Sequence, residues 1–180
     1  VVTGLEKPRK QKKLQPGNRE WVTLVQGVAA TGRIILPFLI FTGKFTSLPC
    51  NWVVMVSPTG WTNNDVAMAW LKHFDAHTKV TSAGAYRLLI IDGHESHCSI
   101  EFQDYCKENK IITLCMPPHS SHLLQPLDVV PYSLLKRHYG DRISLLARSR
   151  IYHINKETFL PAFKVAFKRT FTLENVRAGF

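Results

Sequence analysis

The chain has 180 residues, of which 45% are hydrophobic and 20% charged, and its net charge is +10. This composition is typical of one globular domain with its own core and excludes an intrinsically disordered chain. The longest apolar run spans residues 34–41, far short of the roughly 20 residues that a membrane-spanning helix needs, so we expect no membrane partner.

The first twenty residues predict a basic arm or loop, because Pro8, Pro16 and Gly17 interrupt regular structure there. This segment carries a net charge of +4, residues 131–180 carry +7, and residues 21–130 carry −1. Basic ends around a nearly neutral body suggest a polyanionic partner. A basic surface that contacts only solvent is the alternative.

Three strands are predicted next. Residues 19–30, REWVTLVQGVAA, and residues 34–43, IILPFLIFTG, are rich in β-branched and aromatic residues, and the turn between them predicts a hairpin. Pro37 lies inside the second strand and predicts an edge position or a bulge, because proline cannot donate to a sheet ladder. Residues 52–56 are a further short strand candidate.

Helices and strands alternate in the middle of the chain. Asn63 or Asn64 is the predicted cap of a helix with apolar residues in helical spacing, and Ser99 is the predicted cap of a second helix. The run YRLLIID has the continuous apolar pattern of a central strand that is covered on both faces. The elements predicted here are helices over 65–80 and 100–109 and strands over 86–92 and 111–116.

The last part of the chain predicts a loop followed by helices. Three prolines break residues 117–128, a helix begins at Val129 with an interruption at Gly140, and an amphipathic helix spans residues 156–171. The order of the elements along the whole chain predicts an α/β fold, a mixed sheet flanked by helices.

Two acids lie where a strand ends and where a helix begins. Asp92 ends the predicted central strand, and Asp128 opens a helix 36 positions later. Loops return to the carboxyl edge of such a sheet, so we expect the two carboxylates to converge, and hard oxygen ligands suit Mg²⁺. Two such ions about 4 Å apart would promote cleavage of a phosphodiester. Capping of a turn and of a helix is the alternative role for these acids.

Three segments together resemble one family. LLIIDGHESH, KENKIITLCMPPHSSHLLQPLD and REWVTL are similar to the DDE transposase domain of the pogo, Tigger and jerky type, which includes centromere protein B, over residues 18–180. The resemblance implies a ribonuclease-H-like fold in which three acids hold two divalent ions, Mg²⁺ or Mn²⁺, for DNA strand cleavage and transfer. Asp92 matches the second of these catalytic acids and Asp128 the third.

The resemblance also bears on the domain and on its partners. It implies a nuclear protein that binds DNA and can form a homo-oligomer. Residues 21–150 then correspond to the core of the transposase domain, and residues 151–180 to a C-terminal helical segment of the same domain.

The first acid of the family lies on a strand before the segment that matches REWVTL. Glu6 and Glu20 are the only acids before the hairpin, and neither ends a hydrophobic strand. We therefore expect a core without its N-terminal strand, from a truncated or decayed copy. Two functions stay open: a DDE transposase or endonuclease domain, and a non-catalytic nucleic-acid-binding module that a host has adopted. A zinc-dependent hydrolase fits less well.

Histidines flank the two acids in two H-x-x-H pairs. We expect them to hydrogen-bond and orient the acidic loops: His94, His97, His119 and His122. A zinc site with Cys98 and Cys115 is the alternative, although the spacing is not that of a zinc finger. His73 and His77 lie four residues apart without the glutamate of a zincin motif, which predicts a solvated helix face.

Two basic clusters are candidates for contacts with DNA phosphates. The first lies in the N-terminal arm and contains Lys7, Arg9, Lys10, Lys12 and Lys13. The second lies on the helix that starts beside Asp128 and contains Lys136, Arg137 and Arg142, followed by Arg148 and Arg150. Both predict binding that is independent of the DNA sequence.

Overall fold

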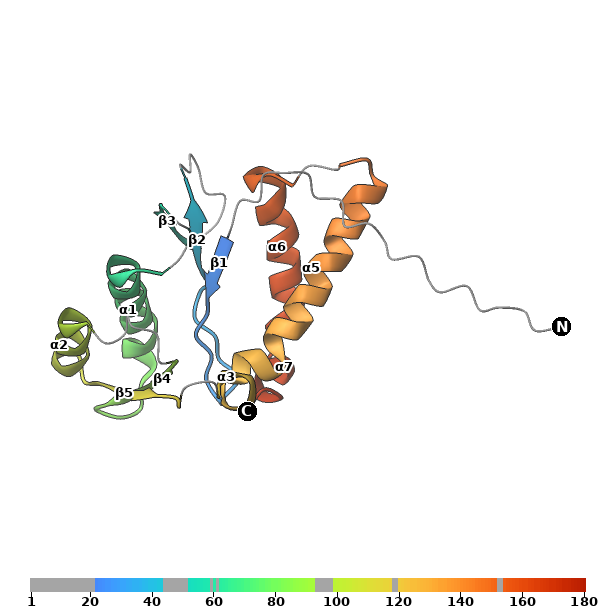
Figure 1. The fold of residues 1–180 in the computed structure, drawn as a ribbon. Helices are drawn as coiled ribbons and strands as arrows, with labels where there is room; N and C mark the ends of the chain where they lie inside the picture. The colour runs from blue at the N-terminus through green and yellow to red at the C-terminus, as the bar shows by residue number, and fades with distance from the viewer. Residues whose placement is uncertain are drawn as a thin grey trace.

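The computed structural model describes residues 22–43, 52–58, 60, 62–92, 99–117, 120–151 and 154–180. Within these residues, two small sheets are flanked by helices (Figure 1). The predicted α/β class is therefore confirmed, with the strands divided between two sheets where the sequence predicted one.

The first sheet has the order β1–β2–β3, where β1 is Val22–Val25, β2 is Phe38–Thr42 and β3 is Val53–Ser57. β1 and β2 are antiparallel, which confirms the predicted hairpin, and β2 and β3 are parallel. β2 is therefore the middle strand of this sheet. The edge position predicted from Pro37 is wrong, because Pro37 precedes the first paired residue of β2 and removes no hydrogen bond from the ladder.

The second sheet contains two parallel strands, β4 at Arg87–Ile91 and β5 at Ile111–Cys115. Helix α1, Asn64–Thr78, continues into the short 3₁₀ helix η1, Lys79–Thr81, and leads to β4. Helix α2, Ile100–Glu108, connects β4 to β5. These elements confirm the helices and strands that the sequence predicts for this part of the chain.

Both helices begin at predicted caps. The side chain of Asn63 accepts a hydrogen bond from the amide of Val66 at 2.9 Å, and the hydroxyl of Ser99 accepts one from the amide of Phe102 at 3.3 Å. Each cap satisfies an amide of the first turn that has no partner within its own helix.

The described residues after β5 form helices: α3 (Ser121–Leu124), α4 (Pro126–Val129), α5 (Pro131–Arg148), α6 (Lys156–Thr170) and α7 (Leu173–Arg177). The predicted interruption at Gly140 is wrong, because α5 runs through this residue without a break. A glycine costs a helix only about 1 kcal/mol, and the packing of α5 along α6 outweighs that cost.

β2 is buried on both faces and separates two core clusters. Phe38 and Ile40 point toward α1 and pack with Leu71, whereas Leu39 and Phe41 point to the opposite face and pack against α6. Figure 1 shows α1 on one side of this sheet and α5 and α6 on the other. Helices thus cover both faces of the strand, which explains why all four consecutive apolar residues are buried.

β4 has only one covered face, so the prediction of a strand covered on both faces is wrong. Leu89 and Ile91 pack into the cluster with α1 and α2, but Leu88 is 60% exposed and Ile90 is 52% exposed. Every residue of the LLII run is apolar, and such a run has no alternation that would reveal an uncovered face.

Candidate functional site

A cavity of about 950 Å³ lies between the two sheets. Its wall is formed by residues 23–25 of β1, residues 87–91 of β4, Trp70 and Phe74 of α1, and the segment over residues 124–128. This volume is at the upper end of the roughly 300–1,000 Å³ that is typical of binding pockets, so the cavity can hold a sizeable ligand.

The cavity brings together the two acids that the sequence singles out. Asp92 directly follows the last residue of β4, and Asp128 lies in α4, where the neighbouring Leu127 is buried in the second core cluster. Both carboxylates are on exposed residues, and both line the cavity. Asp92 and Asp128, which are 36 positions apart in the sequence, therefore line one cavity. This agrees with the expectation that the loop after the sheet returns to the carboxyl end of the strand that precedes Asp92.

Tyr132 is a third member of this site, and the sequence did not indicate it. Burial raises the pKa of the Tyr132 hydroxyl above its usual value, and the negative charges of Asp128 and Asp92 raise it further. Both carboxylates thus lie within electrostatic reach of one hydroxyl group, which stays protonated at neutral pH and keeps a proton to donate. The signal that the sequence offered was the position of Tyr132, four residues after Asp128.

The acids at this site suit a hard divalent ion. Mg²⁺ is usually held by one or two carboxylates, while waters and substrate phosphates complete the octahedron, and Asp92 with Asp128 provides that donor set. Among the described residues there is no group of three or more His, Cys, Asp and Glu side chains suited to a metal ion. The carboxylate oxygens of Asp92 and Asp128 are the hard ligands that Mg²⁺ and Mn²⁺ prefer, whereas the candidate zinc ligands His94, His97, Cys98 and His119 lie outside the described residues.

The flanking histidines can be placed only in part. His122 is an exposed residue of α3, and Cys115 is an exposed free thiol at the end of β5. His94, His97 and His119 lie outside the residues that the structure describes, as does Cys98. The prediction that these histidines orient the acidic loops stays a prediction.

The solvated helix face predicted for the histidine pair of α1 is wrong for His73. Its side chain is 8% exposed, its Nε2 is 2.8 Å from the carbonyl oxygen of Leu36, and its ring packs against Phe38. Burial lowers the pKa of His73 below its usual value. His77 forms a hydrogen bond between its Nδ1 and the His73 carbonyl oxygen at 2.7 Å and lines the cavity.

The basic residues of α5 fall into two environments. Lys136 and Arg137 are exposed residues of α5 and lie eight and nine positions after Asp128. Arg142 is only partly exposed, lines the groove between α5 and α6 beside Pro161, and has a buried Nε without a hydrogen-bond partner in the described structure. The cluster in the N-terminal arm, from Lys7 to Lys13, lies outside the described residues.

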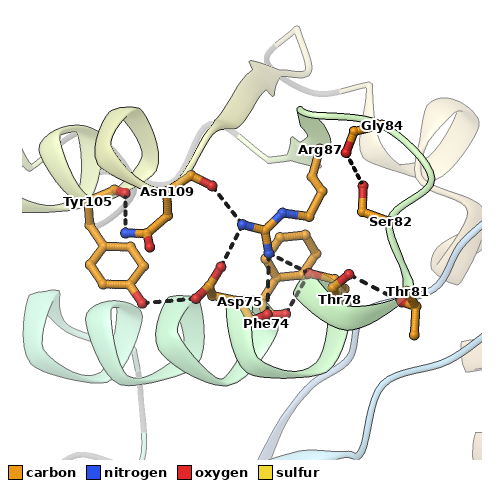
Figure 2. Close-up of polar contacts among 9 residues, drawn as sticks. All are labelled: Phe74, Asp75, Thr78, Thr81, Ser82, Gly84, Arg87, Tyr105 and Asn109. Atoms are coloured by element: carbon orange, nitrogen blue, oxygen red, sulfur yellow. Dashed lines mark hydrogen bonds and ion pairs between the residues drawn. The ribbon is translucent and has the colours of Figure 1, made fainter.

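A buried ion pair fixes the start of β4, the strand that carries Asp92 at its other end (Figure 2). Nη2 of Arg87 is 2.6 Å from Oδ1 of Asp75 in α1 and also donates to the carbonyl oxygen of Asn109 at 2.7 Å. Nη1 of Arg87 donates to the hydroxyl of Thr78 at 3.0 Å. One guanidinium group thus ties β4 to α1 and to the turn before β5.

Comparison with known proteins agrees with this arrangement. A family model described as DDE superfamily endonuclease matches residues 18–180. A relative from Cochliobolus lunatus, named MFS-type transporter clz9, is 50% identical over 187 residues, and the match covers 100% of this chain and 20% of that relative. No solved structure matches the chain.

The match with the transporter covers only one fifth of that protein's length, and its name describes the whole of that protein. In the part of this chain that the structure describes, no helix is both long enough and apolar enough to cross a membrane. The family model, in contrast, covers nearly the whole chain, and its α/β fold agrees with the sheets and flanking helices seen here. The chain belongs to the DDE superfamily endonuclease family.

Proposed function

We propose that this chain is a DNA-processing domain of the pogo, Tigger and jerky type of DDE transposases, which acts on DNA in the nucleus. The observation that carries the proposal is the convergence of Asp92 and Asp128 on one cavity, together with the effect of both carboxylates on Tyr132. The DGHESH and QPLD motifs support this type within the family, because they contain the two converging acids.

In this proposal, Asp92 and Asp128 hold Mg²⁺ or Mn²⁺ at the carboxyl end of β4. A divalent ion bound there supplies activation of a water or hydroxyl group and stabilisation of the leaving oxygen of a phosphodiester. The protonated Tyr132 donates a hydrogen bond to an oxygen at this site, and Lys136 and Arg137 bind DNA phosphates nearby.

Loss of both carboxylates should remove divalent-ion binding. We expect Asp92→Asn with Asp128→Asn to weaken Mn²⁺ binding by more than about tenfold, because a unit charge about 4 Å away contributes about 1 kcal/mol even in bulk water and the ion is divalent. Calorimetric titration with Mn²⁺ measures the difference.

A matched control for this titration removes two exposed carboxylates elsewhere, by Asp104→Asn in α2 with Asp141→Asn in α5. This variant has the same net charge as the first and should bind Mn²⁺ as the wild type does. Equal binding by all three proteins would exclude Asp92 and Asp128 from any metal site.

A non-catalytic nucleic-acid-binding module is the second candidate function. The observation that favours it lies in the sequence, because Glu6 and Glu20 are the only acids before the hairpin and neither ends a hydrophobic strand as the family's first acid does. Cleavage of a phosphodiester by two metal ions needs more metal ligands than the carboxylates of Asp92 and Asp128.

We therefore expect this 180-residue chain to nick supercoiled DNA no faster than background in Mg²⁺ or Mn²⁺. A gel assay of plasmid relaxation measures the rate. Clear nicking that Asp128→Ala abolishes would show that another acid completes the site, and would remove the second candidate.

A further inference from the structure

The outer edge of β5 has no partner strand in the part of the chain that the structure describes. β5 pairs only with β4 among the described strands. The amide of Met116, just after β5, donates to the carbonyl of Ile91 at 2.9 Å, on the β4 side. Backbone groups alternate along a strand, so those of Ile111, Thr113 and Cys115 point away from β4. These three residues provide a row of amides and carbonyls along the outer edge.

β5 lacks the residues that usually protect an edge strand. Its sequence, IITLC, contains no charged residue and no proline. Charged side chains and prolines on an edge strand hinder its pairing with another chain. Lys110 and Pro117 lie just outside the strand, before and after it. The whole length of β5 can therefore pair with a further strand.

The side chains of β5 also leave an apolar surface exposed. Ile112 and Leu114 are each 53% exposed and lie beside the exposed apolar residues of β4 in the register of the two strands. Thr113 points to the opposite face, where its hydroxyl is 3.4 Å from Oε1 of Gln103 in α2. A further strand beside β5 would continue the sheet and contact Ile112 and Leu114 on its open face.

The edge of β5 is complementary to the same edge of a second copy. Antiparallel pairing about a two-fold axis at Thr113 places Thr113 opposite its equivalent, Ile111 opposite Cys115, and Ile112 opposite Leu114. The outward backbone groups of the two copies then match and form about six hydrogen bonds. Each opposed pair is either apolar with apolar or threonine with threonine, and such cross-strand pairs stabilise antiparallel strands.

We propose that two copies of this chain form a dimer by antiparallel pairing of their β5 strands, which gives one sheet with the order β4–β5–β5–β4. The symmetric pattern of side chains around Thr113 favours a second copy over an unrelated strand. The two β4 strands run in opposite directions, so the two Asp92 residues lie at opposite ends of the combined sheet. The proposal does not depend on metal binding or on cleavage.

Sedimentation velocity over a series of concentrations tests this association. We expect the wild-type chain to dimerise and Thr113→Pro to weaken the dimer by more than about tenfold, because proline removes an amide at the two-fold axis from both copies. This amide points away from β4, so its loss removes no hydrogen bond between β4 and β5. Thr113→Val keeps the amide and is the matched control, which should dimerise as the wild type does.

Charged variants test the position of the axis without proline, in case Thr113→Pro does not fold. Thr113→Lys and Thr113→Glu each place like charges opposite one another and should dimerise more weakly than the wild type. An equal mixture of the two places opposite charges together and should recover the dimer. Leu88→Glu changes the exposed face of β4 and not the edge of β5, so it should leave the dimer intact.

Four results would overturn the proposal. The wild-type chain could stay monomeric, or Thr113→Pro and Thr113→Val could dimerise equally. The mixture of charged variants could dimerise as weakly as either variant alone, which would place the axis away from Thr113. Loss of the dimer in Leu88→Glu would show that the copies associate through the exposed faces of their sheets.

Discussion

DNA binding by this chain should fall by roughly 10²–10³ in affinity between about 50 and 200 mM salt. The reason is counterion release: each phosphate contact contributes about −0.9 to the slope of log K against log salt, and we expect about five contacts. The contributing cations are those of the basic arm and those exposed on α5, where Lys136 and Arg137 follow closely after Asp128. Fluorescence anisotropy with two unrelated duplexes measures both the slope and its independence of sequence.

Exposed lysines elsewhere provide the control for this binding. Lys136→Ala with Arg137→Ala should weaken both duplexes equally and reduce the slope by about one or two. Lys72→Ala with Lys107→Ala removes two exposed charges from α1 and α2 and should leave the slope nearly unchanged. Binding that does not depend on salt, or no binding at low salt, would show that the basic ends contact only solvent.

The second large effect concerns stability. Arg87→Ala should lower the free energy of unfolding by about 3–5 kcal/mol, because it leaves Asp75 as a buried charge without its partner. The side chains of Arg87 and Asp75 are only 11% and 10% exposed. Oδ1 of Asp75 accepts no hydrogen bond, so its 2.6 Å contact with Nη2 of Arg87 stabilises by the attraction of opposite charges. The hydrogen bonds from the guanidinium group to Thr78 and Asn109 hold Arg87 in this position. Urea denaturation measures the change.

A double variant separates the cost of burying one unpaired charge from the net contribution of the ion pair to stability. Asp75→Leu with Arg87→Met removes both charges and should destabilise far less than the sum of the single variants. Arg148→Ala, at an exposed position of α5, should change stability by less than about 0.5 kcal/mol. A loss below about 1 kcal/mol for Arg87→Ala would mean that solvent replaces the ion pair at little cost.

Local signals predicted the helices of this chain well. Asn63 and Ser99 cap α1 and α2 because a cap needs only a side-chain oxygen and an amide three residues later. The convergence of Asp92 and Asp128 also followed from local features, the end of an apolar strand and the start of a helix after a loop.

Contacts between distant residues account for what the sequence did not predict. His73 is buried because the carbonyl of Leu36, 37 positions earlier, lies beside its ring, and no pattern within α1 indicates this. β2 is the middle strand because β3 pairs with it, and β4 has an open face because no described element packs on Leu88 and Ile90. Tyr132 joins the acidic site because Tyr132, Asp128 and the end of β4 line the same cavity.

The most direct test of the account is to locate a bound divalent ion. Fe²⁺ replaces Mg²⁺ at many oxygen sites, and with ascorbate and peroxide it produces radicals that cut the nearby backbone. The account predicts cuts next to both Asp92 and Asp128, suppressed by excess Mg²⁺ and absent from the variant with Asp92→Asn and Asp128→Asn. Cuts near only one of these residues, or a pattern that the double variant retains, would contradict a shared metal site.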